Sequence, residues 1–282
     1  ETMHQSLSLQ WLSKKNAASM MGKILSVASL AQLAAYALIF LAGSFFDLSF
    51  TTMFLIAGAV TLVFVVFMTT SFPQFQGGTT QSKTLILRKR YWLYYAITFL
   101  AGARRQIFLV FASWMMVERF GYSFHDIAAL FFVNSAVMMA LAPFLGKLIE
   151  RVGDRSAMVI QYIGLAFVFT AYAFVTVPEI AIALYILDHA FFGLEIAKKT
   201  YFQKIATPSD IAGTTGVAFT INHIAAVIIP VVFGLLWLVS PAAVFLAGTG
   251  MALCSLLLSF LVPRDPAPGH EVIWKWQSFS RP

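Results

Sequence analysis

The feature that most constrains this chain is a series of long apolar stretches that runs along almost its whole length. A helix that crosses the hydrocarbon core of a bilayer needs about 20 mostly apolar residues. Eight stretches meet this requirement: 17–43, 49–70, 91–117, 125–146, 156–177, 180–197, 212–239 and 242–262. Turn-forming or charged residues separate them, and no gap is long enough for a soluble domain. We therefore predict an all-α membrane protein with eight transmembrane helices.

The composition agrees with this class and argues against others. Only 11% of the residues are charged and 60% are hydrophobic, whereas a soluble domain carries roughly 25% charged residues. The net charge of +7 does not indicate nucleic-acid binding, because the basic residues lie between apolar stretches and form no known motif. Cys254 is the only cysteine, which excludes an intrachain disulfide and a cysteine-based metal site.

The basic residues also predict an orientation. Sixteen of the 19 Lys and Arg residues lie in the N-terminal flank, in every second gap and in the C-terminal tail. The other gaps hold only Arg119, and Arg104 and Arg105 lie inside a span. The positive-inside rule then places both termini in the cytoplasm, which requires an even number of spans. The residues expected in the cytoplasm include Lys83, Lys147, Lys204 and Lys275, and those expected outside are Asp47, Glu118 and Glu179.

The N-terminal 16 residues are polar and mixed, and they contain no apolar core of a signal peptide. The first span begins only after Lys14 and Lys15. We therefore expect a chain that is entered midway, at a cytoplasmic loop.

The gap after the fourth span carries a motif. Its sequence from Gly146 to Arg155 reads GKLIERVGDR. This resembles the cytoplasmic loop signature of the major facilitator superfamily, G-x-L-x-D/E-R-x-G-x-R, with Glu150 where the family usually has Asp. The stretch from Gly213 through Asn222 and His223 to Pro230 is similar to the eleventh helix of that family.

The resemblance implies that the eight spans are helices five to twelve of a twelve-helix transporter, so that the chain is N-terminally truncated. The implied segments are a cytoplasmic segment 1–16, the last two helices of the N-terminal half at 17–70, a central cytoplasmic loop 71–90, a complete six-helix half at 91–262, and a cytoplasmic tail 263–282. The full-length protein is expected to be a monomer in a bacterial cytoplasmic membrane.

The loop residues predict a cytoplasmic gate. Gly146 and Gly153 permit a tight helix exit and a close backbone approach. Glu150, Arg151 and Arg155 can pair across a helix–helix contact and hold one conformer closed. The alternative is that these charges only set the topology.

Polar residues inside the spans are candidates for binding, because a charge at mid-membrane costs roughly 2.5–3.5 kcal/mol on insertion scales. Adjacent helical residues point about 100° apart. Arg105 shares a face with the small or polar Tyr91, Tyr94, Thr98 and Gly102, whereas Arg104 falls with apolar residues. We therefore expect Arg105 in a cavity and Arg104 in an inter-helix pair. The candidate substrate- or ion-binding residues are Arg105, Arg104, Asp188, His189, Asn134, Asn222 and His223.

Each candidate has an alternative. An arginine paired with Asp188 can be a structural ion pair, and Asn134 and Asn222 can be inter-helix hydrogen-bonding residues. His189 and His223 can be packing groups or proton carriers.

These observations predict a secondary active transporter that moves a small solute by alternating access, coupled to a proton or another ion. A cavity arginine favours an anionic solute, unless it serves as a countercharge to Asp188. We expect no catalytic residues, no metal and no cofactor, and the lipid bilayer as the surroundings. The alternatives are a membrane-embedded enzyme, which would need a catalytic cluster at one interface, and a membrane sensor, which would usually carry a soluble output domain.

Overall fold

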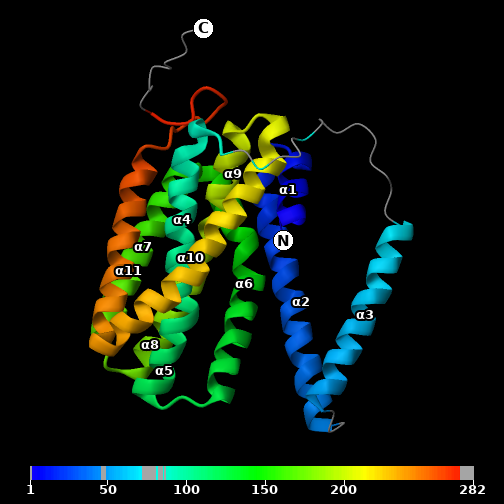
Figure 1. Ribbon diagram of the computed structural model, residues 1–282, viewed down its shortest axis with the longest axis vertical. Helices are drawn as coiled ribbons and strands as arrows, with labels where there is room; N and C mark the ends of the chain where they lie inside the picture. The colour runs from blue at the N-terminus through cyan, green and yellow to red at the C-terminus, as the bar shows by residue number, and fades with distance from the viewer. Residues whose placement is uncertain (1, 46–48, 72–80, 82–84, 86, 274–282) are drawn as a thin grey trace.

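The computed structural model describes residues 2–45, 49–71, 81, 85 and 87–273, and these residues form a bundle of long helices (Figure 1). Eight helices in the described ranges are long and apolar enough to cross a membrane, as predicted. Three of these spans are continuous runs of several helical segments. The elements are α1 (Thr2–Trp11), α2 (Ala17–Phe45), α3 (Phe50–Ser71), η1 (Lys89–Tyr91), α4 (Trp92–Gln106), the π-helical η2 (Ile107–Ala112), α5 (Ser113–Phe120), α6 (Phe124–Val152), α7 (Asp154–Phe174), α8 (Pro178–Phe192), η3 (Gly193–Glu195), α9 (Ile196–Ile205), η4 (Pro208–Asp210), α10 (Ile211–Val239) and α11 (Pro241–Phe260).

Two spans extend beyond their predicted ends, because a helix continues after its apolar stretch. The span of α8, η3 and α9 reaches Ile205 rather than 197, and α6 reaches Val152 rather than 146. Both extensions are rich in charged and polar residues. Hydropathy detects the part of a helix that lies in hydrocarbon, and it does not report helical turns that continue past the hydrocarbon layer.

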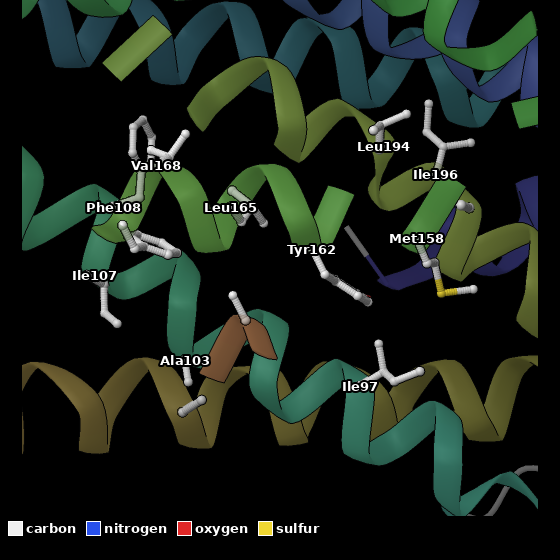
Figure 2. Close-up of a cluster of buried hydrophobic side chains, with 14 of the residues drawn as sticks. Ile97, Ala103, Ile107, Phe108, Met158, Tyr162, Leu165, Val168, Leu194 and Ile196 are labelled. Atoms are coloured by element: carbon white, nitrogen blue, oxygen red, sulfur yellow. The ribbon is translucent and has the colours of Figure 1, made fainter. Parts of the chain in front are cut away.

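The last six spans surround a common core. α7 packs along α11, and α4 packs along α10. Figure 2 shows Ile97, Ala103 and Phe108 of the α4–η2 segment in the same buried cluster as Tyr162 and Leu165 of α7. This core fixes the positions of the polar side chains that the same helices carry.

The first two spans are placed differently. α2 packs against α6 over a long contact. α3 lies apart from the rest of the bundle in Figure 1, and none of the residues in its most apolar window is buried. The short α1, which we had left as a polar segment without predicted structure, packs on α9 and α10.

The two ends of the bundle differ in their connections. The α6–α7 turn at Gly153 and the α9–α10 connection lie at one end, which we call the Gly153 end. The α10–α11 turn lies at the opposite end, which we call the Ser240 end. Of the residues used to predict orientation, Asp47, Lys83 and Lys275 lie outside the described residues, as does most of the expected central loop.

Candidate functional site

Arg104 is the largest of the fully buried side chains among the described residues. Its guanidinium lies 4.7 Å from the centre of the Tyr162 ring on α7. None of its three nitrogens has a hydrogen-bond partner among the described residues. The sequence predicts Arg104 in an inter-helix pair; in the structure its guanidinium contacts the Tyr162 ring on α7 and forms no ion pair among the described residues.

Asp188 on α8 is also fully buried, and neither of its carboxylate oxygens has a hydrogen-bond partner in the described part of the chain. The charge that acts on Asp188 electrostatically is that of Arg104. No salt bridge joins the two side chains. Arg104 and Asp188 are thus a basic and an acidic side chain, both fully buried, that are within electrostatic reach of each other and form no salt bridge, and we refer to them as the buried pair.

Arg105 points to a different region of the molecule. It is exposed and acts electrostatically on His189, which is partly exposed. The ring of His189 lies 5.9 Å from that of Phe108. We call the exposed surface that carries Arg105 and His189 the open face. The π-helical η2 begins two residues after Arg105, and such turns are frequent at functional sites.

The residues that we expected to share the face of Arg105 are not on this surface. Tyr91, Tyr94 and Thr98 are buried, so their stripe lines the packed interior rather than a cavity. Phe202 of α9 covers Tyr91 and Tyr94, with ring centroids 5.6 and 4.4 Å away, and α10 approaches the turn at Gly102. A Cβ added to Gly102 would lie 2.6 Å from the Asn222 side chain, so this turn of α4 is packed directly against α10.

The remaining predicted residues do not join either group. Asn134 on α6 is buried, and neither atom of its amide has a partner among the described residues. The Asn222 side chain lies against Gly102 of α4. His223 is exposed, and its Nδ1 lies 2.8 Å from the carbonyl oxygen of Phe219, on its own helix.

The motif loop makes a close contact between α6 and α2. A Cβ added to Gly146 would lie 2.5 Å from the carbonyl oxygen of Ala18, and one added to Gly22 would lie 2.5 Å from that of Ala142. Only glycine allows two helices to cross at this separation without displacement. The close approach predicted for Gly146 is confirmed, and its counterpart Gly22 had not been recognised.

Glu150 completes this contact. Its Oε1 accepts a hydrogen bond of 2.9 Å from the backbone N–H of Ser19, in the first turn of α2. The first four N–H groups of a helix lack an intrahelical acceptor, and the helix dipole favours a negative charge there. Glu150 therefore caps α2 from the end of α6, and it links the first two spans to the last six.

The two arginines of the motif play no part in this link. Arg151 is exposed, and the guanidinium of Arg155 lies 5.9 Å from the centre of the Phe260 ring on α11. The expectation that both arginines pair across the helix contact is not met, because the group that bonds to the Glu150 carboxylate is the backbone N–H of Ser19, which donates to it. Gly153 has φ of +82°, a conformation that favours glycine.

Asp154, the acidic residue between Gly153 and Arg155, was not among the predicted site residues. Asp154 is buried, and its carboxylate accepts bonds of 2.7 Å from both the Thr200 hydroxyl and Lys204 Nζ. An acidic residue directly after a glycine, at the start of the fifth span, was the signal that could have found it, because carboxylates are favoured in the first turn of a helix. It fixes α7 to α9 at the Gly153 end.

A second missed cluster surrounds Asp210, which we had considered only as part of a turn. The Asp210 carboxylate lies 3.1 Å from Arg88 and 2.5 Å from Arg90, and it accepts a hydrogen bond from the Tyr91 hydroxyl. Arg88 and Arg90 had been counted only as topology charges. They join the start of α4 to the α9–α10 connection.

α1 closes the same end. The Gln203 amide on α9 donates hydrogen bonds of 2.8 and 2.7 Å to the carbonyl oxygens of Leu9 and Leu12. Lys14 Nζ donates to the carbonyl oxygen of Lys204 at 3.1 Å. The segment before α2 is thereby attached to the last six spans.

Toward the Ser240 end, α2 leaves α6. Val27, Leu38 and Ile39 of α2 are more than half exposed, and Figure 1 shows α2 and α6 diverging away from the Gly153 end. The first two and last six spans therefore meet at one end of the bundle and separate toward the other.

Comparison with known proteins identifies a family. The family model described as the Major Facilitator Superfamily matches residues 94–281, which is more than half of the chain and includes Arg105, Asp188 and Glu150. No curated protein matches the chain. Among the described residues, no group of three or more His, Cys, Asp or Glu side chains is placed to hold a metal ion.

Proposed function

The chain belongs to the Major Facilitator Superfamily, and from this premise we propose that it moves a small anionic solute across the membrane by alternating access, coupled to protons. The observation that carries the proposal is the contact between α2 and α6, which is close at the Gly153 end and opens toward the Ser240 end. An arrangement closed at one end and open at the other is one of the two states that alternating access requires. In this scheme residues 91–262 act as one six-helix half, and residues 17–70 belong to the other.

The orientation of this state follows from charge. Lys14, Arg88 and Lys204 lie at the Gly153 end, and basic residues favour the cytoplasmic side. We therefore propose that the structure is closed toward the cytoplasm, with both termini on that side. The expected membrane is the bacterial cytoplasmic membrane, and the expected functional unit is a monomer.

The open face is the proposed solute site. Arg105 is exposed there beside His189, and a guanidinium binds a carboxylate or phosphate through two parallel hydrogen bonds. Asp188 acts electrostatically with Arg104 rather than with Arg105. The carboxylate that Arg105 acts on is that of Glu195, which already pairs with Lys198 Nζ at 3.4 Å, and this supports Arg105 as a solute-binding residue instead of a permanent countercharge to Asp188.

The buried pair is the proposed proton site. A fully buried carboxylate with no hydrogen-bond donor is stabilised when it takes up a proton. Protonation of Asp188 would change the charge of the bundle interior beside Arg104, so it could bias one of two conformations.

The test uses the protein in liposomes that contain a pH-sensitive dye, with small carboxylates and matched amines added outside. We expect a carboxylate to change the internal pH beyond the change in protein-free liposomes. Arg105→Gln should abolish the difference, and Arg119→Gln, which removes an exposed arginine near the Ser240 end, should preserve it. A response to amines alone would contradict the anionic solute.

A further inference from the structure

A pocket of about 500 Å³ lies at the Ser240 end, between α5, α7, α10 and α11. Pockets that hold small molecules typically enclose about 300–1,000 Å³. All four helices belong to the last six spans, so the pocket is separate from the contact between α2 and α6. Arg105 and Asp188 are not among the residues that line it. The proposed function therefore assigns this pocket no role.

The inner wall of the pocket is aromatic and apolar. It is lined by Trp237, Phe245 and Met115, and all three side chains are buried. The rings of Trp237 and Phe245 meet edge to face, with 5.9 Å between their centroids. Phe111 stacks on Trp237 with 5.6 Å between the centroids. These contacts hold the two pocket rings in place, so a ligand meets a preformed apolar wall.

A carboxylate is fixed beside this wall. The exposed Glu118 lines the pocket, and its Oε2 accepts a hydrogen bond of 2.7 Å from Trp237 Nε1. The salt bridges of the described residues do not include Glu118. An ionised carboxylate has about four lone-pair sites, so one bond from Trp237 leaves room for donors from a ligand. The pocket thus presents an oriented negative charge that no basic side chain in the described part of the chain neutralises.

The neighbouring Arg119 also reaches the pocket, but it is placed differently. Its guanidinium lies 6.0 Å from the centre of the Phe120 ring. Phe120 is not one of the residues that line the pocket. The charged group that is bonded to the aromatic wall is therefore Glu118, and the pocket is better suited to a cation than to an anion.

We propose that this pocket binds a small organic ammonium ion, with its charge on Glu118 and its apolar body against Trp237 and Phe245. An ammonium N–H donates to the carboxylate, and such charge-assisted hydrogen bonds are about twice as strong as neutral ones. The face of an aromatic ring also attracts a cation, and tryptophan does so most strongly. The site selects a charge opposite to that selected by Arg105, so it is a second site with a different ligand.

The test is calorimetric titration of the whole chain in nanodiscs of phosphatidylglycerol, a lipid without an amine, with empty nanodiscs as the blank. The probes are phenethylamine and hydrocinnamate, which carry an ammonium and a carboxylate on the same apolar body. We expect phenethylamine to bind and hydrocinnamate not to bind. Glu118→Gln keeps an acceptor oxygen for Trp237 and removes the charge, so it should weaken phenethylamine binding about tenfold. Ala242→Trp fills the pocket and should abolish the binding.

The matched control is Glu179→Gln, which makes the same change at an exposed carboxylate of the Ser240 end that does not line the pocket. It should leave the affinity unchanged. Arg119→Gln removes a like charge and should not weaken binding. The proposal is overturned if phenethylamine gives no more heat than with empty nanodiscs, or if Glu118→Gln binds it as the parent does. It is also overturned if hydrocinnamate binds and Arg119→Gln removes that binding.

An ammonium ion can come from a free amine or from a lipid headgroup, and a second lipid separates the two sources. Phosphatidylethanolamine carries a primary ammonium. If its headgroup occupies the pocket, adding it to the nanodiscs should weaken phenethylamine binding to the parent protein by competition. An unchanged affinity would assign the pocket to a free amine.

Discussion

α3 and the span of α4, η2 and α5 lie in the same chain and pack in opposite ways. α3 is the most apolar of the eight spans in the described ranges, with a mean hydropathy of 2.3, yet none of the residues in its most apolar window is buried. The α4 span has a mean hydropathy of 1.2, and 56% of its window is buried. In lipid, the hydrophobic effect does not drive helices together, because the tails are as apolar as the side chains. Apolarity therefore places a helix in the membrane without determining its neighbours.

The packed span is distinguished by small and polar residues. Gly102 allows α10 to approach, and Arg104 reaches the Tyr162 ring on α7. The corresponding small residue of α3 is Gly58, and a Cβ added there would meet nothing within 4 Å. α2 is packed to an extent between those of α3 and the α4 span. Gly22 brings one part of α2 onto α6, and residues such as Leu38 farther along the helix are exposed. Specific contacts thus account for the difference between these helices.

The largest loss in the free energy of unfolding is expected for a substitution at the buried pair, which lies inside the packed region. Arg104→Ala would leave Asp188 without its countercharge, and breaking a buried pair typically costs about 3–5 kcal/mol. The free energy of unfolding in detergent should fall by this amount at alkaline pH, where Asp188 is ionised, and by less as the pH is lowered and Asp188 takes up a proton. Arg105→Ala should change the free energy of unfolding little, because Arg105 is exposed.

The double variant Arg104→Ala/Asp188→Ala separates this effect from lost packing. It should be more stable than Arg104→Ala alone, since no charge is left behind. Equal losses of stability in Arg104→Ala and Arg105→Ala would remove the distinction between the buried pair and the open face.

A smaller loss of stability is expected at the contact between α2 and α6. Gly146→Leu places a side chain against the Ala18 carbonyl, and overpacking of this kind typically costs about 1–3 kcal/mol. We expect α2 to move away from α6 at the Gly153 end. Spin labels on Lys23→Cys and Lys147→Cys, in a Cys254→Ser background, should report a longer distance than in the parent protein.

Gly58→Leu on α3 is the matched control. It adds the same side chain to a helix that has open space at this position, so the label distance should not change. A Gly146→Leu variant with an unaltered distance would show that the α2–α6 contact does not hold the Gly153 end closed.

The comparison also explains which features the sequence could predict. Eight spans follow from length and hydropathy alone, and the structure has them. The helical repeat separates Arg104 from Arg105, but it also predicts Arg105 in a cavity with Tyr91, Tyr94 and Thr98, and these three are buried while Arg105 is exposed. The contacts of Gly146 could be anticipated because glycine in a charged loop motif indicates close approach.

Other features depend on which helices become neighbours, and hydropathy does not carry that information. The buried Tyr94 looks like a cavity residue along α4, but its ring stacks on that of Phe202 from α9 with 4.4 Å between the centroids. Glu150 caps the backbone of α2, and no side-chain pattern indicates a main-chain partner 131 residues away. Asp154 and Asp210 look like ordinary turn residues, and their lysine and arginine partners come from distant segments.

The smallest change in the free energy of unfolding is expected for a substitution on α3, because none of the residues in its most apolar window is buried. Leu55 is 69% exposed, so truncation to alanine leaves no cavity, and lipid can fill the space. Leu55→Ala should change the free energy of unfolding by no more than about 0.5 kcal/mol. Leu165→Ala in α7 makes the same chemical change at a fully buried position, shown in Figure 2, and should cost about 2–5 kcal/mol. Unfolding of both variants, measured under the same conditions in one detergent, gives the difference directly. A cost at Leu55 close to that at Leu165 would mean that α3 is packed against protein in the membrane, and the contrast between the two regions would then be wrong.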